Sequence, residues 1–409
     1  MRPSLNLLLL LVAGGAVGIA DAQQLHPLAL AETAPTDDLA PLARAIGDRR
    51  IVLLGENGHG VGEFSRLKIR LVEWLHREMG FDVIAIESGF WECATASAKL
   101  AELSPRAALH DCLAYTFQHA ELLPLFNYLR SARATAAPLY LAGIDIQAQG
   151  YDSRERPAWS RALLAPRAAG LAERVAWQDS LIYLPTQLGG LGDAVYPWLV
   201  RQGGVVAARY DSAAALLEGT DRWSYRMSRG LVDRLQLRAD AEAAGQARPA
   251  RYYEVRDEWM AQAIRTLADS IDGRRKVVVW LHNDHGRYGA WTAGPLRVRS
   301  AGSFLREWMP AEVFSVGFFM ASGETTDNGR TVRSVGVPPA GGIEAFLAGE
   351  GAARYLLLAG NRDPAVRRWA DSARRYLRNG TTERSMVPGE EFDALVLVDS
   401  VGPPGYRIP

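Results

Sequence analysis

The amino-acid sequence predicts an α/β protein with a central, mainly parallel sheet flanked by helices and a mostly helical insertion. Short apolar, β-branched runs alternate with longer segments whose apolar residues recur at helical spacing, as in such folds. We expect strands at residues 50–54, 82–86, 138–146, 276–281, 313–319 and 394–398, and we place the last of these at a sheet edge. Between the first two, residues 64–79 carry Leu67, Leu71 and Leu75 at helical spacing, which predicts a helix.

The middle of the chain differs from the rest. From about residue 153 to about residue 250 the sequence is rich in Ala, Arg, Leu and Trp and has few strand signals. We interpret it as a helical insertion or cap over the sheet, and a continuous second domain is the alternative. Its tryptophans either pack in a core, which we favour, or line a large apolar pocket. They are Trp159, Trp177, Trp198 and Trp223.

The N-terminus has the pattern of a secretion signal. Arg2 supplies a positive charge, residues 5–17 are almost wholly apolar, and Ala20-Asp21-Ala22 forms a small-x-small cleavage site. An uncleaved anchor is the alternative, although the apolar run is shorter than the roughly 20 residues of a membrane span. We therefore predict a signal peptide over residues 1–22 and a mature chain of residues 23–409. That chain would be periplasmic or secreted, with no membrane attachment.

The chain contains two cysteines, Cys93 and Cys112. In an oxidising compartment an even pair of this kind can form a disulfide. Two buried, unpaired thiols are almost equally compatible with the sequence, so both states stay open.

The balance of charge argues against nucleic acid or an anionic membrane as a partner. The 409 residues include 46 Lys and Arg and 46 Asp and Glu, so no net field would attract nucleic acid or an anionic membrane. The length is ample for a sizeable hydrophobic core. We expect a small molecule as the partner, and no nucleic acid.

Polar, mostly titratable residues follow four of the predicted strands. Open α/β sheets bind ligands at the carboxyl ends of their strands, so residues that follow several strands are expected to meet in one site. Near neutral pH, His is a common general base, and a carboxylate beside it orients the ring and raises its basicity. The residues are Glu56 and His59 after the first strand, Glu87 after the second, Asp145 and Gln147 after the third, and His282 and His285 after the fourth.

Glycines surround the first of these segments, at Gly55, Gly58 and Gly60. They allow a sharp turn and a close approach of the backbone to a ligand, or they mark only a tight strand-to-helix connection. No Gly-x-Ser-x-Gly elbow occurs, which argues against a serine-based triad. No phosphate-binding or dinucleotide-binding glycine motif follows a strand.

A metal site is the main competing interpretation. Zn, Mn or Fe would accept Glu56, His59, Glu87, His282 and His285 as ligands. The spacings Glu-x-x-His and His-x-x-His do not distinguish metal ligation from proton transfer.

The motifs resemble the erythromycin esterase family in an ordered series that covers most of the chain. The matching segments are residues 54–60, 64–71, 86–90, 143–147, 256–261, 280–285, 302–308 and 392–395. The helical middle matches least. The resemblance implies hydrolysis of an ester by water, without a covalent enzyme intermediate. In the named members the ester is the lactone of a macrolide.

Carried over by position, the resemblance implies roles for individual residues. His59 resembles the general base, and Glu56 and Glu87 resemble its acidic partners. His282 or His285 would stabilise or protonate the reacting oxygens. Lys68 occupies the place of a basic residue that is Arg in some members, and Lys lacks the bidentate fork of Arg.

Our working hypothesis is an exported, metal-independent hydrolase of carboxylic esters or lactones, with no cofactor, and macrolide ring opening is one candidate reaction. Residues 23–409 would form one erythromycin esterase-like domain. We add Asp145, Gln147 and Arg256 as substrate-binding residues. The alternatives are a metal-dependent hydrolase or peptidase that uses the same cluster, and a non-catalytic protein that binds a small molecule.

Overall fold

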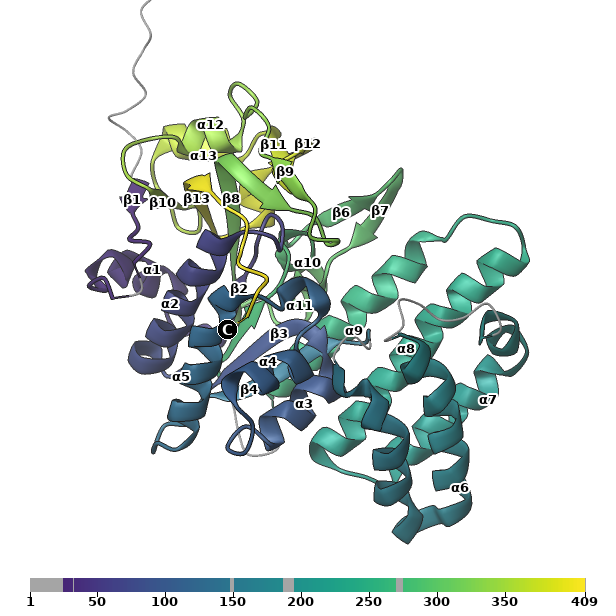
Figure 1. The fold of residues 1–409 in the computed structure, drawn as a ribbon. Helices are drawn as coiled ribbons and strands as arrows, with labels where there is room; N and C mark the ends of the chain where they lie inside the picture. The colour runs from purple at the N-terminus through teal and green to yellow at the C-terminus, as the bar shows by residue number, and fades with distance from the viewer. Residues whose placement is uncertain (1–24, 32, 148–150, 187–194, 270–274, 409) are drawn as a thin grey trace, which may run out of the picture.

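A computed structural model describes residues 25–31, 33–147, 151–186, 195–269 and 275–408 of the chain. It confirms the α/β fold: a mainly parallel sheet with helices on both faces and a group of helices beside it (Figure 1). The predicted signal peptide, residues 1–22, lies outside the described residues. No described helix combines the length and the apolarity that a membrane crossing requires.

The main sheet is parallel through its centre and antiparallel at one edge. From one edge to the other its strands are β1 (Leu25–Pro27), β10 (Ala353–Leu357), β13 (Ala394–Val401), β8 (Val313–Thr326), β2 (Ile51–Leu54), β5 (Val277–Trp280), β3 (Val83–Gly89) and β4 (Tyr140–Asp145). All neighbours from β13 to β4 pair in parallel, and β1 and β10 pair antiparallel. The long β8 also pairs with β9 (Val332–Ser334).

One strand prediction was wrong in its position. The segment 394–398 forms a strand, but β13 lies between β10 and β8 rather than at an edge. Its run from Ala394 to Val398 is fully buried, and a continuous apolar run is typical of a strand covered on both faces.

Alternate residues of the central strands contribute to two separate cores. In β2, Val52 and Leu54 pack with the cluster on one face, whereas Ile51 and Leu53 pack with the cluster on the other. The first face is covered by α1 (Ala40–Ile46), α2 (Gly62–Met79), α3 (Phe90–Ala98), α4 (Pro105–Cys112) and α5 (Leu123–Arg133). The second face is covered by α9 (Ala250–Ala268) and α11 (Ala301–Trp308).

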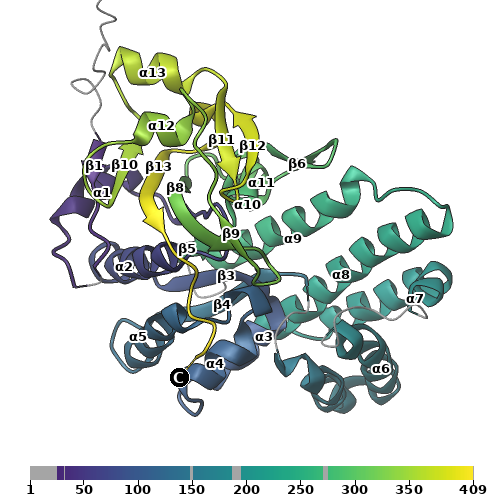
Figure 2. The same cartoon turned by 45° about the horizontal axis from the view of Figure 1, so that its top comes forward.

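Every described element between β4 and β5 is helical. These elements are η5 (Tyr151–Glu155), α6 (Arg156–Thr186), α7 (Val195–Ala215), α8 (Gly219–Ala243) and α9. Helices α6 to α8 stand together beside the sheet, and α9 connects them to it (Figures 1 and 2). Two of the four tryptophans of this region, Trp177 and Trp198, contact each other, with ring centroids 5.6 Å apart.

The remaining elements are short and lie mostly around the carboxyl edge of the sheet. They are η2 (Asp37–Leu39), η3 (Tyr115–Phe117), η4 (Ala120–Leu122), α10 (Asn283–Gly286), β6 (Ala290–Ala293), β7 (Leu296–Arg299), α12 (Ile343–Leu347), α13 (Pro364–Ala370), β11 (Arg374–Arg378), β12 (Thr382–Met386) and α14 (Pro388–Glu391). Two of the pairs, β6–β7 and β11–β12, are separate antiparallel hairpins.

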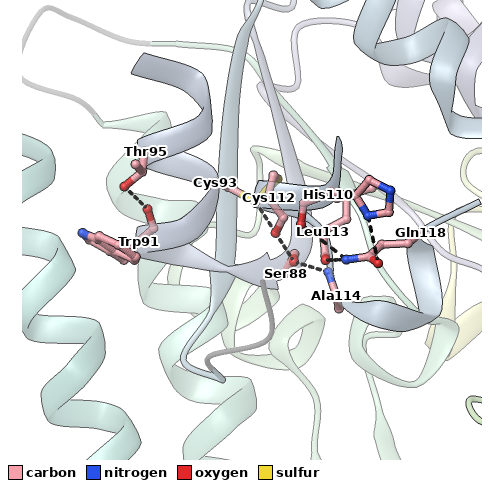
Figure 3. The surroundings of a disulfide bond; sticks show 9 residues. All are labelled: Ser88, Trp91, Cys93, Thr95, His110, Cys112, Leu113, Ala114 and Gln118. Atoms are coloured by element: carbon pink, nitrogen blue, oxygen red, sulfur yellow. Dashed lines mark hydrogen bonds between the residues drawn. A yellow bond between two sulfur atoms is a disulfide. The ribbon is translucent and has the colours of Figure 1, made fainter. Parts of the chain in front are cut away.

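The two cysteines form a disulfide that joins α3 to the end of α4 (Figure 3). The hydroxyl of Ser88, at the end of β3, donates to the carbonyl of Cys112 at 2.7 Å and accepts from the amide of Ala114 at 2.8 Å. These bonds fix the start of the segment that leads to Phe117. The bonds of Ser88 thus fasten this segment to the strand that carries Glu87, and the disulfide ties the end of α4 to α3.

Candidate active site

The predicted site residues at the carboxyl ends of β2, β3 and β5 meet at one edge of the sheet. These strands are neighbours in the order β2, β5, β3, so Glu56, His282 and Glu87 emerge side by side. Glycine is required in the turn after β2. A Cβ atom on Gly55 would lie 2.2 Å from Oδ1 of Asn283, and Gly58 has φ +117°, a conformation that L side chains rarely adopt.

Glu56 and His59 form a tight pair. The imidazole Nδ1 of His59 lies 2.6 Å from Oε1 of Glu56. Burial opposes ionisation of Glu56, but the charge of Lys68 and the hydrogen bond from His59 outweigh it and lower the pKa of Glu56 to about 2. An ionised Glu56 accepts a proton-bearing Nδ1, which leaves Nε2 of His59 as the nitrogen with a lone pair.

Lys68 and Trp280 hold the other oxygen of the Glu56 carboxylate. The Lys68 ammonium donates to Oε2 at 2.7 Å, and the indole of Trp280 donates to the same atom at 3.0 Å. Lys68 is fully buried in α2 and also lies 4.6 Å from the centre of the Trp280 ring. Burial lowers the pKa of Lys68 to about 8, against the opposing charge of Glu56.

Glu87 pairs with Arg256 rather than with His59. The guanidinium of Arg256 donates to Glu87 at 2.7 Å and to Asp145 at 2.6 Å, and the amide of His282 donates to the second oxygen of Glu87. Burial opposes ionisation of Glu87, but the charges of His285 and Arg256 outweigh it and hold its pKa well below the ordinary range. Gln147 donates to Asp145 from its side chain and its backbone.

His282 is a neutral hydrogen-bond donor. Burial, together with the charges of His59 and Arg378, lowers its pKa to about 4 despite the carboxylate of Asp284. Its Nδ1 accepts from the amide of Asp284 at 3.0 Å, so the proton is on Nε2. This Nε2–H lies 2.8 Å from Oδ1 of Asn379, in the turn of the β11–β12 hairpin.

His285, unlike His282, lies between two carboxylates. Its Nδ1 is 2.7 Å from Asp257, and its Nε2 is 3.4 Å from Glu87 and 3.0 Å from Arg256. Burial and the charge of Arg256 oppose protonation, but the carboxylates of Asp257 and Glu87 outweigh them and raise the pKa of His285. The pKa of His285 is therefore shifted in the opposite direction to that of His282.

The three histidines line a cavity of about 980 Å³. Their rings form a row with Phe117 at one end and Trp291 at the other. Ring centroids along the row are 4.7 Å apart for Phe117 and His59, 5.3 Å for His59 and His282, 6.5 Å for His282 and His285, and 5.7 Å for His285 and Trp291. Glu87, Arg256 and Gln147 also reach this cavity.

The predicted ligand set does not form a metal cage. Within the described ranges, no three His, Cys, Asp or Glu side chains form a group that could hold a metal ion. The carboxylates of Glu56 and Glu87 are each directed at cations and N–H donors, which compete with a metal for the same oxygens.

Comparison with known proteins identifies the family. The family model described as erythromycin esterase matches residues 76–401 of the chain. The chain belongs to the erythromycin esterase family. The matched range contains Glu87, Arg256, His282 and His285, and it begins after the segment that carries Glu56 and His59.

Two curated relatives of this family member are similar in sequence. The putative hydrolase YbfO of Bacillus subtilis is 25% identical over 399 residues, which cover 91% of this chain and 88% of that protein. The erythromycin esterase type II of Escherichia coli is 32% identical over 115 residues, which cover 28% of this chain and 27% of that protein.

Solved structures share the fold of this family member. A succinoglycan biosynthesis protein aligns with a TM-score of 0.79 at 18% identity, covering 94% of this chain and 96% of that one. A Bacillus cereus protein aligns with a TM-score of 0.77 at 20% identity, over the same shares of both chains. A mutant of the erythromycin esterase EreC in its open conformation aligns with a TM-score of 0.69 at 17% identity, covering 93% and 98%.

The structure places some predicted site residues at the cavity and others behind it. His59, Glu87, His282, His285, Gln147 and Arg256 line the cavity. Glu56, Lys68 and Asp145 do not line the cavity and are buried behind it. Glu56 contacts His59, the ammonium of Lys68 contacts Glu56, and the carboxylate of Asp145 contacts Arg256.

Several residues of the site were missed by the sequence analysis. Arg378 pairs with Asp284 at 2.6 Å, and Asn379 contacts His282. The backbone of this turn is fixed by Asn57, whose side chain accepts from the Asn379 amide and donates to the Leu377 carbonyl. Asn379 has φ 54°, which Asn tolerates better than most residues. No local pattern around residue 379 indicates a partner more than 300 positions away.

Proposed function

We propose that the protein hydrolyses carboxylic esters or lactones, with His59 as the general base that activates water. Membership in the erythromycin esterase family and similarity to a protein named a putative hydrolase support a hydrolase. The observation that carries the finer proposal is the His59–Glu56 pair. An ionised carboxylate holds one nitrogen of a ring whose other nitrogen is available in a large cavity.

In this reaction His59 takes a proton from water while the water oxygen attacks the ester carbonyl. The carbonyl oxygen becomes negative, and two donors lie on the same cavity wall: the Nε2–H of His282, which it would share with Oδ1 of Asn379, and the guanidinium of Arg256. The C–O bond to the alcohol then breaks. The leaving alkoxide takes a proton from His59 or His285, which yields a carboxylic acid and an alcohol.

Two further features belong to the proposal. Macrolide lactones are candidate substrates because relatives carry the name erythromycin esterase. Export is supported by the N-terminal signal pattern and by the Cys93–Cys112 disulfide, since such bonds form and persist in oxidising compartments.

The first experiment compares wild type with His59→Ala on 4-nitrophenyl acetate and on a 14-membered macrolide, after EDTA treatment and with a metal assay. We expect wild-type turnover that survives EDTA and a fall of about 10²–10⁴-fold in His59→Ala. His26→Ala is the matched control, because His26 stacks on Tyr355 at the far edge of the sheet. Full activity of His59→Ala would refute the assignment, and activity that requires added metal would favour a metallohydrolase.

A further inference from the structure

The large cavity has an unusual lining. Among the described residues that line it there is no Ala, Val, Leu, Ile, Met or Pro side chain. A second cavity of about 820 Å³, between α3, β4 and α8, differs because Phe90, Trp91 and Leu141 are part of its wall. Small-molecule pockets are usually lined mostly by hydrophobic and aromatic side chains, so the first cavity is built for a polar ligand.

The charges of this lining cancel in pairs. Arg256 pairs with Glu87 at 2.7 Å, Arg378 with Asp284 at 2.6 Å, and Arg333 with Asp327 at 3.2 Å. No surplus of one sign is left to select an anionic or a cationic ligand. The ligand that fits is therefore polar and uncharged.

Hydroxyl and amide groups form the outer wall. Thr116, Asn328, Thr331 and Thr381 line the cavity, and their side chains make no hydrogen bond within the described chain. Their donors and acceptors are available to a ligand that carries many hydroxyl groups. An apolar ligand would cover them without replacing the water they bind, which costs free energy.

The two aromatic rings lie at opposite ends of the histidine row. Phe117 is adjacent to His59, and Trp291 is adjacent to His285. Aromatic rings supply apolar contact area at the cavity, and the C–H faces of a sugar ring can pack against them. A ligand with polar edges and apolar faces would use both kinds of group.

We propose that the substrate is an O-acylated carbohydrate whose sugar occupies this cavity and whose acyl ester lies over the histidine row. The proposal rests on the proposed ester hydrolysis and specifies its alcohol. Water adds to the acyl carbon, the bond from that carbon to the sugar oxygen breaks, and the sugar hydroxyl leaves with a proton. The cavity of about 980 Å³ lies at the upper end of ordinary ligand pockets and has room for more than one sugar unit.

The test measures kcat/KM of the purified full chain on four esters. They are a mono-O-acetylated maltose, 4-nitrophenyl acetate, 4-nitrophenyl decanoate and a 14-membered macrolide. We expect the acetylated maltose to exceed 4-nitrophenyl acetate by at least about tenfold despite its poorer leaving group. Turnover of the decanoate and of the macrolide should be lower.

The variant Trp291→Leu tests whether the aromatic ring at one end of the histidine row contacts the sugar. We expect it to lower the ratio of kcat/KM for acetylated maltose to that for 4-nitrophenyl acetate by about two- to tenfold, because the aromatic contact is lost. Trp177→Leu is the matched control, since Trp177 lies in α6, is 52% exposed, and does not line the cavity. An isothermal titration of His59→Ala with free maltose checks binding without turnover, and wild-type-like folding is verified by circular dichroism.

The outcomes separate the two proposals. A preference for the decanoate or the macrolide, with hydrolysis still dependent on His59, overturns the carbohydrate assignment and leaves the hydrolase intact. An unchanged ratio in Trp291→Leu also counts against it. Turnover of none of the four esters overturns the proposed function itself, even if maltose binds.

Discussion

Two buried carboxylates at the same edge of the sheet have different surroundings. Glu56, after β2, contacts one lysine, one indole and His59, whose second nitrogen is available in the cavity. Glu87, in β3, is held by a backbone amide and by Arg256, which also grips Asp145. Both carboxyls have lowered pKa values, but for different reasons.

The two clusters therefore differ in their expected roles: the Glu56 cluster transfers a proton, and the Glu87 cluster holds charged groups in fixed positions. The Glu56 cluster contains His59, whose Nε2 faces the cavity and which we propose as the general base. The Glu87 cluster is a fixed set of charges, because two carboxylates surround an arginine whose pKa they raise further. Variants of the first cluster should lose proton transfer, and Arg256 variants of the second should lose stability in addition to a donor for the reacting oxygen.

The largest effect is expected from Glu56→Gln. Without the carboxylate, His59 loses the partner that fixes its tautomer, and kcat/KM on 4-nitrophenyl acetate should fall by about 10²–10⁴-fold. Glu78→Gln, at an exposed position on α2, is the control and should retain activity. Near-normal turnover in Glu56→Gln would remove the distinction between the two clusters.

Arg256→Met should combine a loss of activity with a large loss of stability. It leaves Glu87 and Asp145 buried without their cation, and breaking such a pair costs about 3–5 kcal/mol in the free energy of unfolding. Urea denaturation measures the loss. Arg256→Lys keeps the charge without the fork and should lie between wild type and Met. A fully stable Arg256→Met would show that the second cluster does not support the fold.

Acid titration should report the perturbed carboxyl of Glu56. The folded-state pKa of Glu56, about 2, is below its ordinary value of 4.5. Its contribution to stability is therefore complete above pH 4.5 and is lost as pH falls toward 2, by about 3 kcal/mol. Wild type should lose more unfolding free energy than Glu56→Gln over this window. Parallel pH profiles would argue against a strongly perturbed carboxyl.

The smallest expected effect concerns the hairpin turn above the site. Asn379→Ala removes the acceptor for Nε2–H of His282 and should lower kcat about five- to tenfold, the value of one hydrogen bond. KM should change less, because the loss falls on the orientation of His282. Asn127→Ala, at an exposed position on α5, is the control. A change in KM alone would assign Asn379 to substrate binding.

The sequence predicted which residues lie in the site better than it predicted which side chains they contact. Titratable residues directly after strands marked Glu56, Glu87 and His282, because strand ends in such sheets meet at one edge. The predicted pairing of Glu87 with His59 was wrong, because Glu87 pairs with Arg256. In chain order the second strand follows the first, but in space β5 is inserted between β2 and β3 and brings His282 between the two carboxylates.

No local signal showed which distant side chains pair in the site, even where a residue such as Arg256 was itself predicted. Arg256 is on α9, after the whole helical insertion, and Asn379 is in a hairpin formed near the C-terminus. Lys68 was found by resemblance, but only the packing of α2 against Trp280 shows that it is sealed from the cavity. Local patterns thus indicate which strands end in the site, and the tertiary fold decides which side chains meet there.

The disulfide between Cys93 and Cys112 links the rigidity of the cavity wall that contains Phe117 to the redox conditions under which the protein is produced. It closes a loop across a separation of 19 residues, and a cross-link of that size is worth about 3 kcal/mol in the chain-entropy model. The chain that leaves Cys112 leads to Phe117, which lies beside His59, and Ser88 bonds the backbone of Cys112 and Ala114 at the start of this segment. Material matured in a reducing cytosol would carry a looser wall in an otherwise intact sheet. A preparation can therefore be well folded by bulk criteria and still differ in substrate affinity from one matured in an oxidising compartment.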